Sequence, residues 1–165
     1  MRLITAVAGA AAIFALTGCG DSNNDPVQEE VAQEETFTLQ LLHLADVDGG
    51  GTAAMFSVDE FSALVDHFRK EMPSNTVVAS SGDNYIPGPI FTASEDDRMN
   101  AVVGVAGEGR GETQIQNKLG IQVSAVGNHD LDAGPSGFAG IISPDGEYPG
   151  AEYPYISANV DFSTG

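Results

Sequence analysis

The sequence predicts an α/β fold, and two observations carry that prediction. First, apolar strand-like segments alternate along the chain with helix-like segments, which is the pattern of a parallel sheet with helical crossovers. Second, several of the strand-like segments are followed directly by carboxylate, amide or imidazole side chains. Because the carboxyl ends of parallel strands meet at one edge of a sheet, we expect these polar groups to share one site.

Four segments are predicted to be strands: Phe37–Leu44, Thr76–Ser80, Ile121–Gly127 and Tyr155–Val160. The first is almost continuously apolar, which is typical of a strand buried on both faces. His43 lies near the end of that strand, and we expect it to be a buried histidine in the core or behind the site rather than a metal ligand.

The segment Ser57–Met72 is the clearest helix. Ser57 and Glu60 have the spacing of a capping box, and Pro73 ends the pattern. The apolar stripe that should face the core consists of Val58, Phe61, Leu64, Val65, Phe68 and Met72. His67 lies off this stripe, so we expect a solvated surface histidine.

Two further helices are predicted, at Glu112–Leu119 and, interrupted by glycines, at Leu131–Ile142. The sequence assigns no element to the stretch 90–111, in which Ala101–Ala106 is apolar. Within it, Gly107–Gly111 reads Gly-Glu-Gly-Arg-Gly, but no strand precedes it and no Gly-Lys-Ser/Thr follows. A mobile loop is therefore the better interpretation than a loop that cradles phosphate.

Composition narrows the possible partners. The chain has 165 residues and is 42% hydrophobic, which allows one domain with a real core. Its formal net charge of −18, with only 6 basic residues, argues against nucleic acid, whose phosphates are neutralised by Lys and Arg. An acidic surface favours solubility and cation binding, and adaptation to a salty habitat is one explanation.

The N-terminal segment has the features of an export signal. Arg2 is followed by an Ala-rich apolar stretch from Leu3 to Leu16, too short for a membrane-spanning helix. The sequence Leu16-Thr17-Gly18-Cys19 resembles the bacterial lipobox, in which the cysteine is lipidated. The alternative is an ordinary signal peptide followed by a chance cysteine.

The chain therefore divides into a lipoprotein signal peptide at 1–18, an acidic disordered tether at 19–36, and a domain at 37–165. This predicts a protein of the bacterial cell envelope, periplasmic or on the outer face, held to the membrane by a lipid on Cys19. With one cysteine, the chain has no internal disulfide.

The residues after the first strand allow three interpretations. Asp46 to Gly51 is a glycine-rich turn, a calcium loop of the EF-hand kind, or a metal site at a strand end. The calcium loop is disfavoured because Ser57 stands where that loop needs Glu. Asp46 and Asp48 are two apart, so on extended backbone both carboxylates face one cation. Asp83 follows the second strand and binds either turn amides or, as we favour, a metal.

Three motifs, each after a predicted strand, carry a family resemblance. They are Leu42-His43-Leu44-Ala45-Asp46-Val47-Asp48-Gly49, then Gly82-Asp83 with Gly88-Pro89, then Gly127-Asn128-His129-Asp130-Leu131-Asp132. Together they resemble the calcineurin-like metallophosphoesterases, and more closely the catalytic domain of the 5′-nucleotidase branch, which includes UDP-sugar hydrolases. Ile156–Val160 is similar to that family too, so the resemblance runs from about Phe37 to Val160.

The resemblance implies a four-layer α/β/β/α sandwich with two divalent metal ions (Mn, Mg, Ca or Zn) at the strand ends. Asp46 and Asp48 would bind the first ion, Asp83 would bridge the two, and Asn128 would bind the second. Family members have His at the position of Asp48. Because a carboxylate is a harder ligand, we expect Mn²⁺, Mg²⁺ or Ca²⁺ rather than Zn²⁺.

The implied activity is hydrolysis of a small phosphorylated substrate, a nucleotide above all, as in nucleotide catabolism. A hydroxide shared by the two ions would attack phosphorus in line with the leaving oxygen. His129 would contact the phosphoryl group and Asp132 would orient His129. An imidazole at that place stabilises developing charge or protonates the leaving group.

The family also takes histidine ligands from later Gly-His and Gly-His-x-His motifs and has a separate substrate-binding domain. None of the 3 histidines here follows His129, so we expect the chain to be the front part of a longer enzyme. Two alternatives stay open: a lipid-anchored binding or adhesion module that kept the scaffold without catalysis, and a calcium-stabilised surface domain without activity.

Overall fold

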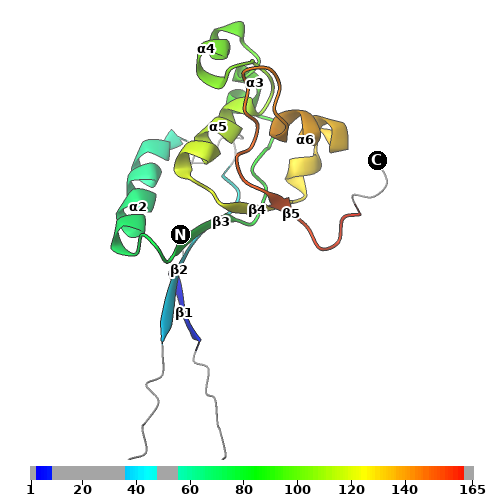
Figure 1. Cartoon of the computed structure of the whole chain (residues 1–165). Coiled ribbons are helices and arrows are strands. Elements are labelled where there is room, and N and C mark those ends of the chain that lie inside the picture. The colour runs from blue at the N-terminus through cyan, green and yellow to red at the C-terminus, as the bar shows by residue number, and fades with distance from the viewer. Residues whose placement is uncertain (1–2, 9–35, 48–55, 162–165) are drawn as a thin grey trace, which may run out of the picture.

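The computed structural model describes the backbone of residues 3–8 and, with side chains, residues 36–47 and 56–161. Its sheet has five strands in the order β1-β2-β3-β4-β5 (Figure 1). Strands β2 (Phe37–Leu44), β3 (Thr76–Ser80), β4 (Val123–Ala125) and β5 (Tyr155–Ile156) pair in parallel, and β1 (Leu3–Ala8) pairs antiparallel with β2. The predicted α/β fold with a parallel sheet is confirmed.

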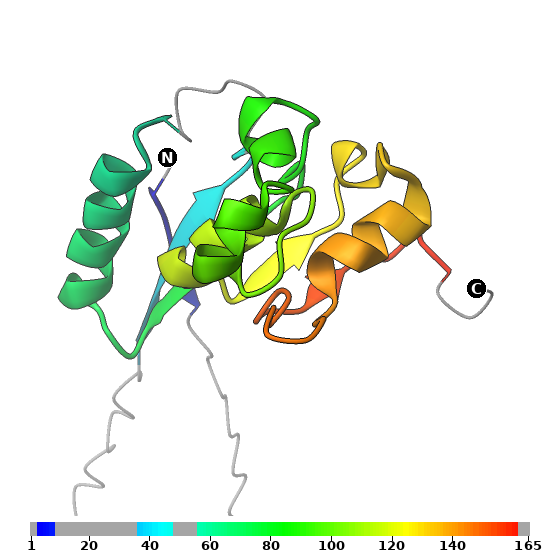
Figure 2. The ribbon, with the colours of Figure 1, turned by 90° about the horizontal axis from the view of Figure 1, so that it is seen from above.

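Helices connect each parallel strand to the next. They are α2 (Val58–Glu71), α3 (Pro89–Ala93), α4 (Asn100–Val103), α5 (Arg110–Leu119) and α6 (Gly134–Ile142). Successive strands are neighbours and every step runs the same way, so right-handed crossovers place the helices on one face of the sheet. Figure 2 shows α5 and α6 lying over the strands, with α2 beside the β1–β2 end of the sheet. The described residues thus form one sheet and one helical layer, and the four-layer sandwich stays a prediction.

The strands β2 and β3 begin and end where the sequence predicts, whereas β4 and β5 are shorter. β4 stops before Gly127 because the Gly127 N–H donates to the Asp130 carboxylate instead of a neighbouring strand. β5 stops at Ile156, and the Ser157 hydroxyl then donates to the Asn159 side chain within a turn. The expectation that β2 is buried on both faces is wrong, since burial alternates from Gln40 onward.

Helix α2 matches the predicted helix closely, with two corrections. Ser57 has φ −115° and ψ 34°, and its hydroxyl makes no cap hydrogen bond, so the predicted capping box is absent. Leu64, expected in the core, is 41% exposed, whereas Val65 is buried. His67 is a surface histidine as predicted, with its Nε2 3.5 Å from a Glu71 carboxylate oxygen.

The stretch 90–111 is more regular than predicted. It holds α3, a 3₁₀ turn at Asp97–Met99, α4 and the start of α5. Pro89 stands in the first turn of α3, a position where a missing N–H costs nothing. Arg110 lies 4.5 Å over the Tyr148 ring and pairs with Asp145 at 2.9 Å. These contacts anchor the segment that the sequence analysis took for a mobile loop.

The hydrophobic core lies between the sheet and the helices, in two clusters. The first surrounds β2 and β3 and contains Leu42, Leu44, Val47, Val65, Val78, Ile121 and Tyr153. The second lies under α3 and α6 and contains Tyr85, Phe91, Phe138 and Ile141. Together they hold the carboxyl ends of the strands rigidly against the helical layer, because close-packed interiors leave little room for movement.

Several predictions fall wholly or partly outside the described residues, among them the signal peptide at 1–18, the tether at 19–36, the lipidation site Cys19 and the metal ligand Asp48. Among the helices that are described, none is long and apolar enough to cross a membrane. Strand β1 lies within the predicted signal peptide. Cleavage of that peptide would leave β2 as the edge strand, and the cleavage itself stays a prediction.

Candidate active site at the carboxyl edge of the sheet

The ends of β2, β3 and β4 meet, as the sequence predicts. Asp46 follows β2, Asp83 follows β3, and Asn128 and His129 follow β4. The Asp46 N–H donates to the Gly82 carbonyl at 3.3 Å. The His129 N–H donates to Asp83 Oδ1 at 2.8 Å. Direct hydrogen bonds therefore join the loop after β2 to the loop after β3, and that loop to the loop after β4.

Two of the predicted metal ligands have an unusual backbone. Asp46 has φ 56° and Asp83 has φ 55°. In the described part of the chain, no other residue apart from glycine has a positive φ. The left-handed region is uncommon for residues other than glycine, although Asp enters it more readily than most, and it costs on the order of 1–3 kcal/mol per residue. Such strain persists where the surrounding structure imposes it, and it gathers at functional sites.

The loops after β3 and β4 touch through glycines. A Cβ added to Gly82, where φ is 95°, would lie 2.4 Å from the Gly127 nitrogen. A Cβ added to Gly127 would lie 2.2 Å from Asp83 Oδ1. Only glycine fits at either position, so the motif glycines serve the contact between these loops.

Asp130 is the site residue whose role the sequence analysis missed. It was quoted within the third motif but received no function. Its side chain is 2% exposed. Oδ2 accepts the N–H groups of Asp83 (3.2 Å) and Gly127 (2.8 Å), and Oδ1 accepts that of Asn84 (2.7 Å). Burial raises the pKa of this carboxyl above its usual range, and nearby Asp83 adds to the rise, while the backbone donors lower it. The available signal was an acidic residue next to a strand-end histidine.

His129 and Asp132, the predicted catalytic pair, are hydrogen-bonded to each other. The His129 Nδ1 lies 2.8 Å from Asp132 Oδ2, and both side chains are about two-fifths exposed, at 43% and 41%. A carboxylate at Nδ1 favours the tautomer with its proton on that nitrogen. The pair lies on the 3₁₀ turn His129–Leu131 and the residue that caps it. The imidazole is therefore oriented and accessible to solvent.

A buried polar layer supports these loops from below. The amide of Asn84, fully buried, accepts from the Ser80 hydroxyl (2.8 Å) and donates to the hydroxyls of Ser124 (2.8 Å) and Tyr155 (3.2 Å). The Tyr155 hydroxyl donates to that of Tyr85 at 3.0 Å, and burial raises the pKa of both tyrosines. Satisfied buried networks of this kind make a local structure rigid. The network ties β3, β4 and β5 together under the site.

The described part of the metal ligand set is two carboxylates and one amide. No group of three His, Cys, Asp or Glu side chains in residues 36–47 and 56–161 is arranged to hold a metal ion. Asp48, the third predicted carboxylate, lies outside those residues. The donors of Asp46, Asp83 and Asn128 are all oxygens, which is the chemistry that hard divalent cations take. The residues that are described fit part of such a site.

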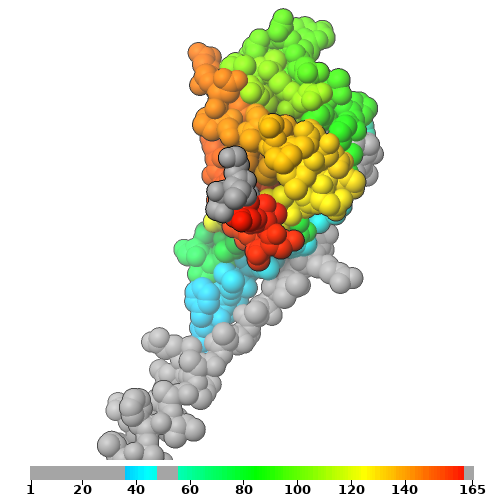
Figure 3. All heavy atoms as spheres, turned by 90° about the vertical axis from the view of Figure 1, so that its right-hand side faces the viewer, coloured from blue at the N-terminus to red at the C-terminus, as the bar shows by residue number. Residues whose placement is uncertain are grey.

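A groove of about 440 Å³ lies beside these loops, at the carboxyl ends of β4 and β5. We call it the edge groove, and it is lined by Ala125, Val126, Ile156, Ser157, Ala158 and Asn159. Figure 3 views the molecule from this side, with the segment from β4 to α6 in yellow to orange packed above the end of β5 in red.

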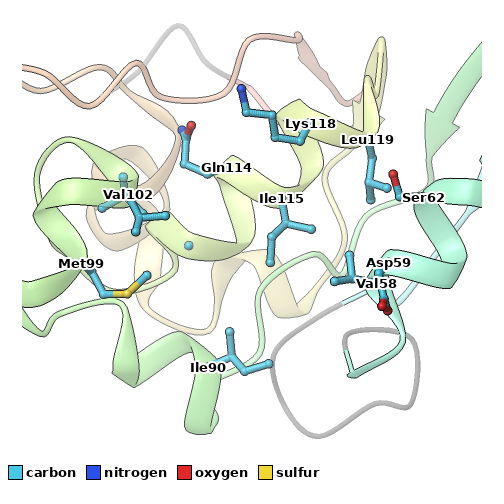
Figure 4. Close-up of a pocket in the computed structure, with 12 residues that line it drawn as sticks. Val58, Asp59, Ser62, Ile90, Met99, Val102, Gln114, Ile115, Lys118 and Leu119 are labelled. Atoms are coloured by element: carbon cyan, nitrogen blue, oxygen red, sulfur yellow. The ribbon is translucent and has the colours of Figure 1, made fainter. Parts of the chain in front are cut away.

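A second hollow, of about 400 Å³, lies elsewhere, among the helices (Figure 4). We call it the helix hollow. It is lined by Val58, Asp59, Ser62, Ile90, Met99, Val102, Val103, Gly111, Gln114, Ile115, Lys118 and Leu119. Of the site residues that the structure describes, none of Asp46, Asp83, Asn128, His129 and Asp132 lines either this hollow or the edge groove.

Comparison with known proteins gives one finding that bears on function. No family model matches the chain. The chain is 28% identical over 102 residues to Protein 5NUC of Lutzomyia longipalpis, a match that covers 62% of this chain and 14% of that protein. The chain thus spans a small part of the length of this relative. The similarity points to 5′-nucleotidase-like proteins, the group that the sequence motifs resemble.

Proposed function

We propose that this chain carries part of the active site of a metal-dependent phosphoester hydrolase of the 5′-nucleotidase type, acting on a small phosphorylated substrate such as a nucleotide. The observation that carries the proposal is the strained backbone of Asp46 and Asp83, at neighbouring strand ends whose loops are hydrogen-bonded to each other. The similarity to Protein 5NUC supports the nucleotide as substrate.

The proposed metal ligands divide between two divalent ions. Asp46 and Asp48 would hold one ion, Asp83 would contact both, and Asn128 would hold the other. Divalent ions, when bound, supply positive charge that polarises phosphoryl oxygens and lowers the pKa of a water molecule. The chain's part is to hold these oxygen donors on a rigid edge, which the hydrogen bonds between the loops do.

His129 would handle the proton. Its ring is partly exposed at the edge. Asp132 Oδ2, 2.8 Å away, would accept a hydrogen bond from the Nδ1–H group and stabilise the charged imidazole. The other ring nitrogen, Nε2, is then the atom that donates to a phosphoryl oxygen or to the leaving oxygen. Asp132 orients the ring and does not itself contact substrate in this proposal.

The test is hydrolysis by the full-length protein with Mn²⁺, using a nucleoside 5′-monophosphate and p-nitrophenyl phosphate as substrates. We expect EDTA to abolish turnover and Asp83→Ala to lower kcat/KM by about 100-fold or more. Asp66→Ala, on exposed α2, is the control. Turnover that survives EDTA, or equal rates for the two variants, would contradict the proposal. Metal analysis that finds only zinc would contradict the preference for harder cations.

A second candidate is a metal-binding or adhesion module without catalysis on the same scaffold. It is favoured by Asp48, which stands where the resembled family has His. Binding of Mn²⁺ without hydrolysis of either substrate would support this module and exclude the enzyme.

We also propose that the protein is exported and anchored in the bacterial cell envelope through a lipid on Cys19. The Leu16-Thr17-Gly18-Cys19 sequence after an apolar stretch supports this proposal. Detergent phase partition of the expressed protein is the test. The wild type should enter the detergent phase and Cys19→Ser should not; partition of both into the aqueous phase would contradict it.

A further inference from the structure

Asp130 joins the two loops that carry Asp83 and His129, and we propose that it is a positioning residue of the site. Its carboxylate holds the loop after β3 against the loop after β4, so that the Asp83 carboxylate and the His129 ring keep a fixed relative position. This inference rests on the proposed function, because Asp83 and His129 are the groups that it would position.

The hydrogen bonds across the two loops are reciprocal. From the β4 side, the Asp130 carboxylate accepts the N–H groups of Asp83 and Asn84 at 3.2 and 2.7 Å. From the β3 side, the Asp83 carboxylate accepts the His129 N–H at 2.8 Å. Each loop therefore supplies a carboxylate to the backbone of the other. Loss of one partner leaves buried N–H groups without acceptors and loosens the other bond.

A carboxylate is the side chain that this place requires. Three backbone N–H groups, from Asp83, Asn84 and Gly127, donate hydrogen bonds to the Asp130 carboxylate. Both of its oxygens act as acceptors. Asparagine has the same shape, but its NH₂ would face at least one N–H donor. Two donors in contact repel, and a buried donor without an acceptor destabilises the structure.

The loops after β3 and β4 are packed so closely that neither can move without displacing the other. Gly127 approaches Asp83 so closely that even a Cβ would overlap its carboxylate. A shift of Gly127, once released from Asp130, is therefore passed directly to the Asp83 side chain. Asp130 itself is buried, and both of its oxygens are occupied by backbone donors. It acts through Asp83 and His129, not by contact with substrate.

The experiment compares Asp130→Asn with Thr113→Val in the full-length protein. Thr113 is also fully buried, and its hydroxyl bonds to Tyr85 at 3.0 Å, two residues beyond Asp83. Its loss leaves the three backbone hydrogen bonds to Asp130 in place. Both changes are nearly isosteric and remove buried hydrogen bonds, so both should lower the melting temperature. Two measurements then separate them: Mn²⁺ affinity by calorimetry, and hydrogen exchange of metal-free protein in peptides containing Gly127 and His129.

We expect Asp130→Asn to weaken Mn²⁺ binding by about 10- to 100-fold and to speed exchange at Gly127 and His129 by about tenfold. Thr113→Val should leave both at the wild-type value. If Asp130→Asn fails to fold, Asp130→Glu replaces it. That variant keeps both acceptors but displaces them by one methylene, so exchange in the same peptides should still exceed that of Thr113→Val.

Exchange in those peptides that is the same in the Asp130 variant and in Thr113→Val would overturn the inference and leave Asp130 a purely structural residue. The exchange measurement needs no metal. If the wild type binds no Mn²⁺ and hydrolyses nothing, the proposed function fails, yet exchange still decides whether Asp130 holds the loops. Failure of the inference and failure of the proposed function are therefore distinguishable.

Discussion

The edge groove and the helix hollow have similar volumes, about 440 and 400 Å³, but they differ in what surrounds them. The edge groove adjoins loops in which carboxylates, an amide and an imidazole gather over a buried hydrogen-bond network. The helix hollow is lined mainly by aliphatic side chains, such as Val58, Ile90 and Ile115. Volume does not separate the two, and the lining of neither contains Asp46, Asp83, Asn128, His129 or Asp132. What marks the edge groove is that polar groups converge in the loops next to it.

The two regions also differ in how firmly their walls are held. Each loop at the sheet edge is fixed by hydrogen bonds to the next, and Asp130 alone accepts three. Val102, in the wall of the helix hollow, is 69% exposed. The amide nitrogen of Gln114, also in that wall, is buried without a hydrogen-bond partner among the described atoms. The hydrogen bonds at the sheet edge therefore fix the relative positions of its side chains, whereas the wall of the helix hollow is held less firmly.

The largest expected effect separates two exposed histidines. His129→Ala should lower kcat by about 10²–10⁴-fold, the range for loss of an acid–base group, with little change in melting temperature. His67→Ala is the matched control, because His67 is a surface histidine that also lies next to a carboxylate. Steady-state kinetics and thermal melts of both variants provide the test. If His129→Ala and His67→Ala lost activity equally, His129 would have no special role in catalysis compared with a surface histidine.

Next in size is the effect of the carboxylate partners. Asp132→Asn replaces the charged acceptor at His129 Nδ1 with a neutral amide, and we expect kcat to fall by about 10–100-fold, less than for His129→Ala. Glu71→Gln is the control, since Glu71 lies 3.5 Å from His67 Nε2. A double variant with His129→Ala should be no worse than His129→Ala alone. Full additivity in that double variant would show that Asp132 acts independently of His129.

Much of the sheet edge could be predicted from the sequence, because strands and the polar residues that follow them have local sequence patterns. β2, β3 and the meeting of Asp46, Asp83 and His129 at one edge follow from apolar runs and parallel pairing. The different roles of Asp130 and Asp132 do not. Both are aspartates two positions apart, and only the backbone path after Gly127 decides that the first is buried among N–H groups and the second faces His129.

Other features escaped because they depend on tertiary contacts. The helices α3 and α4 have weak local signals, and the tight turn into α5 depends on Arg110 packing over Tyr148. The helix hollow lies between segments far apart in the sequence, so no single stretch of sequence predicts it. The capping box at Ser57 is absent because the Ser57 hydroxyl makes no cap hydrogen bond, which the sequence pattern alone does not reveal.

The third prediction concerns the buried Tyr148, whose hydroxyl bonds to the Ile141 carbonyl and whose ring lies under Arg110. Burial raises the pKa of Tyr148 to about 12 from an ordinary value of 10.0. The unfolded chain therefore ionises first, so stability is complete below pH 10 and falls between pH 10 and 12.

The free energy of unfolding should drop by about 2 kcal/mol from Tyr148 across that window. Denaturant melts at several pH values measure it. Tyr148→Phe should be less stable at neutral pH, because it loses the hydrogen bond to the Ile141 carbonyl, and should show a shallower alkaline decline. An unchanged alkaline slope in Tyr148→Phe would show that Tyr148 is not the group responsible.

The smallest expected effect lies in the helix hollow. Val102→Asp places a charge on its exposed wall, and we expect stability to stay within about 0.5 kcal/mol of wild type and kcat/KM to be unchanged. Chemical denaturation and the hydrolysis assay are the measurements. A large loss of activity from Val102→Asp would mean that the hollow, and not the sheet edge alone, takes part in the reaction.

The most direct test of the central claim is anomalous diffraction from crystals of the full-length protein soaked in Mn²⁺. The account predicts anomalous peaks at the carboxyl edge of the sheet, between the side chains of Asp46, Asp83 and Asn128, and their loss in Asp83→Ala. Peaks confined to other acidic surfaces, or no peak at this edge at saturating Mn²⁺, would contradict it.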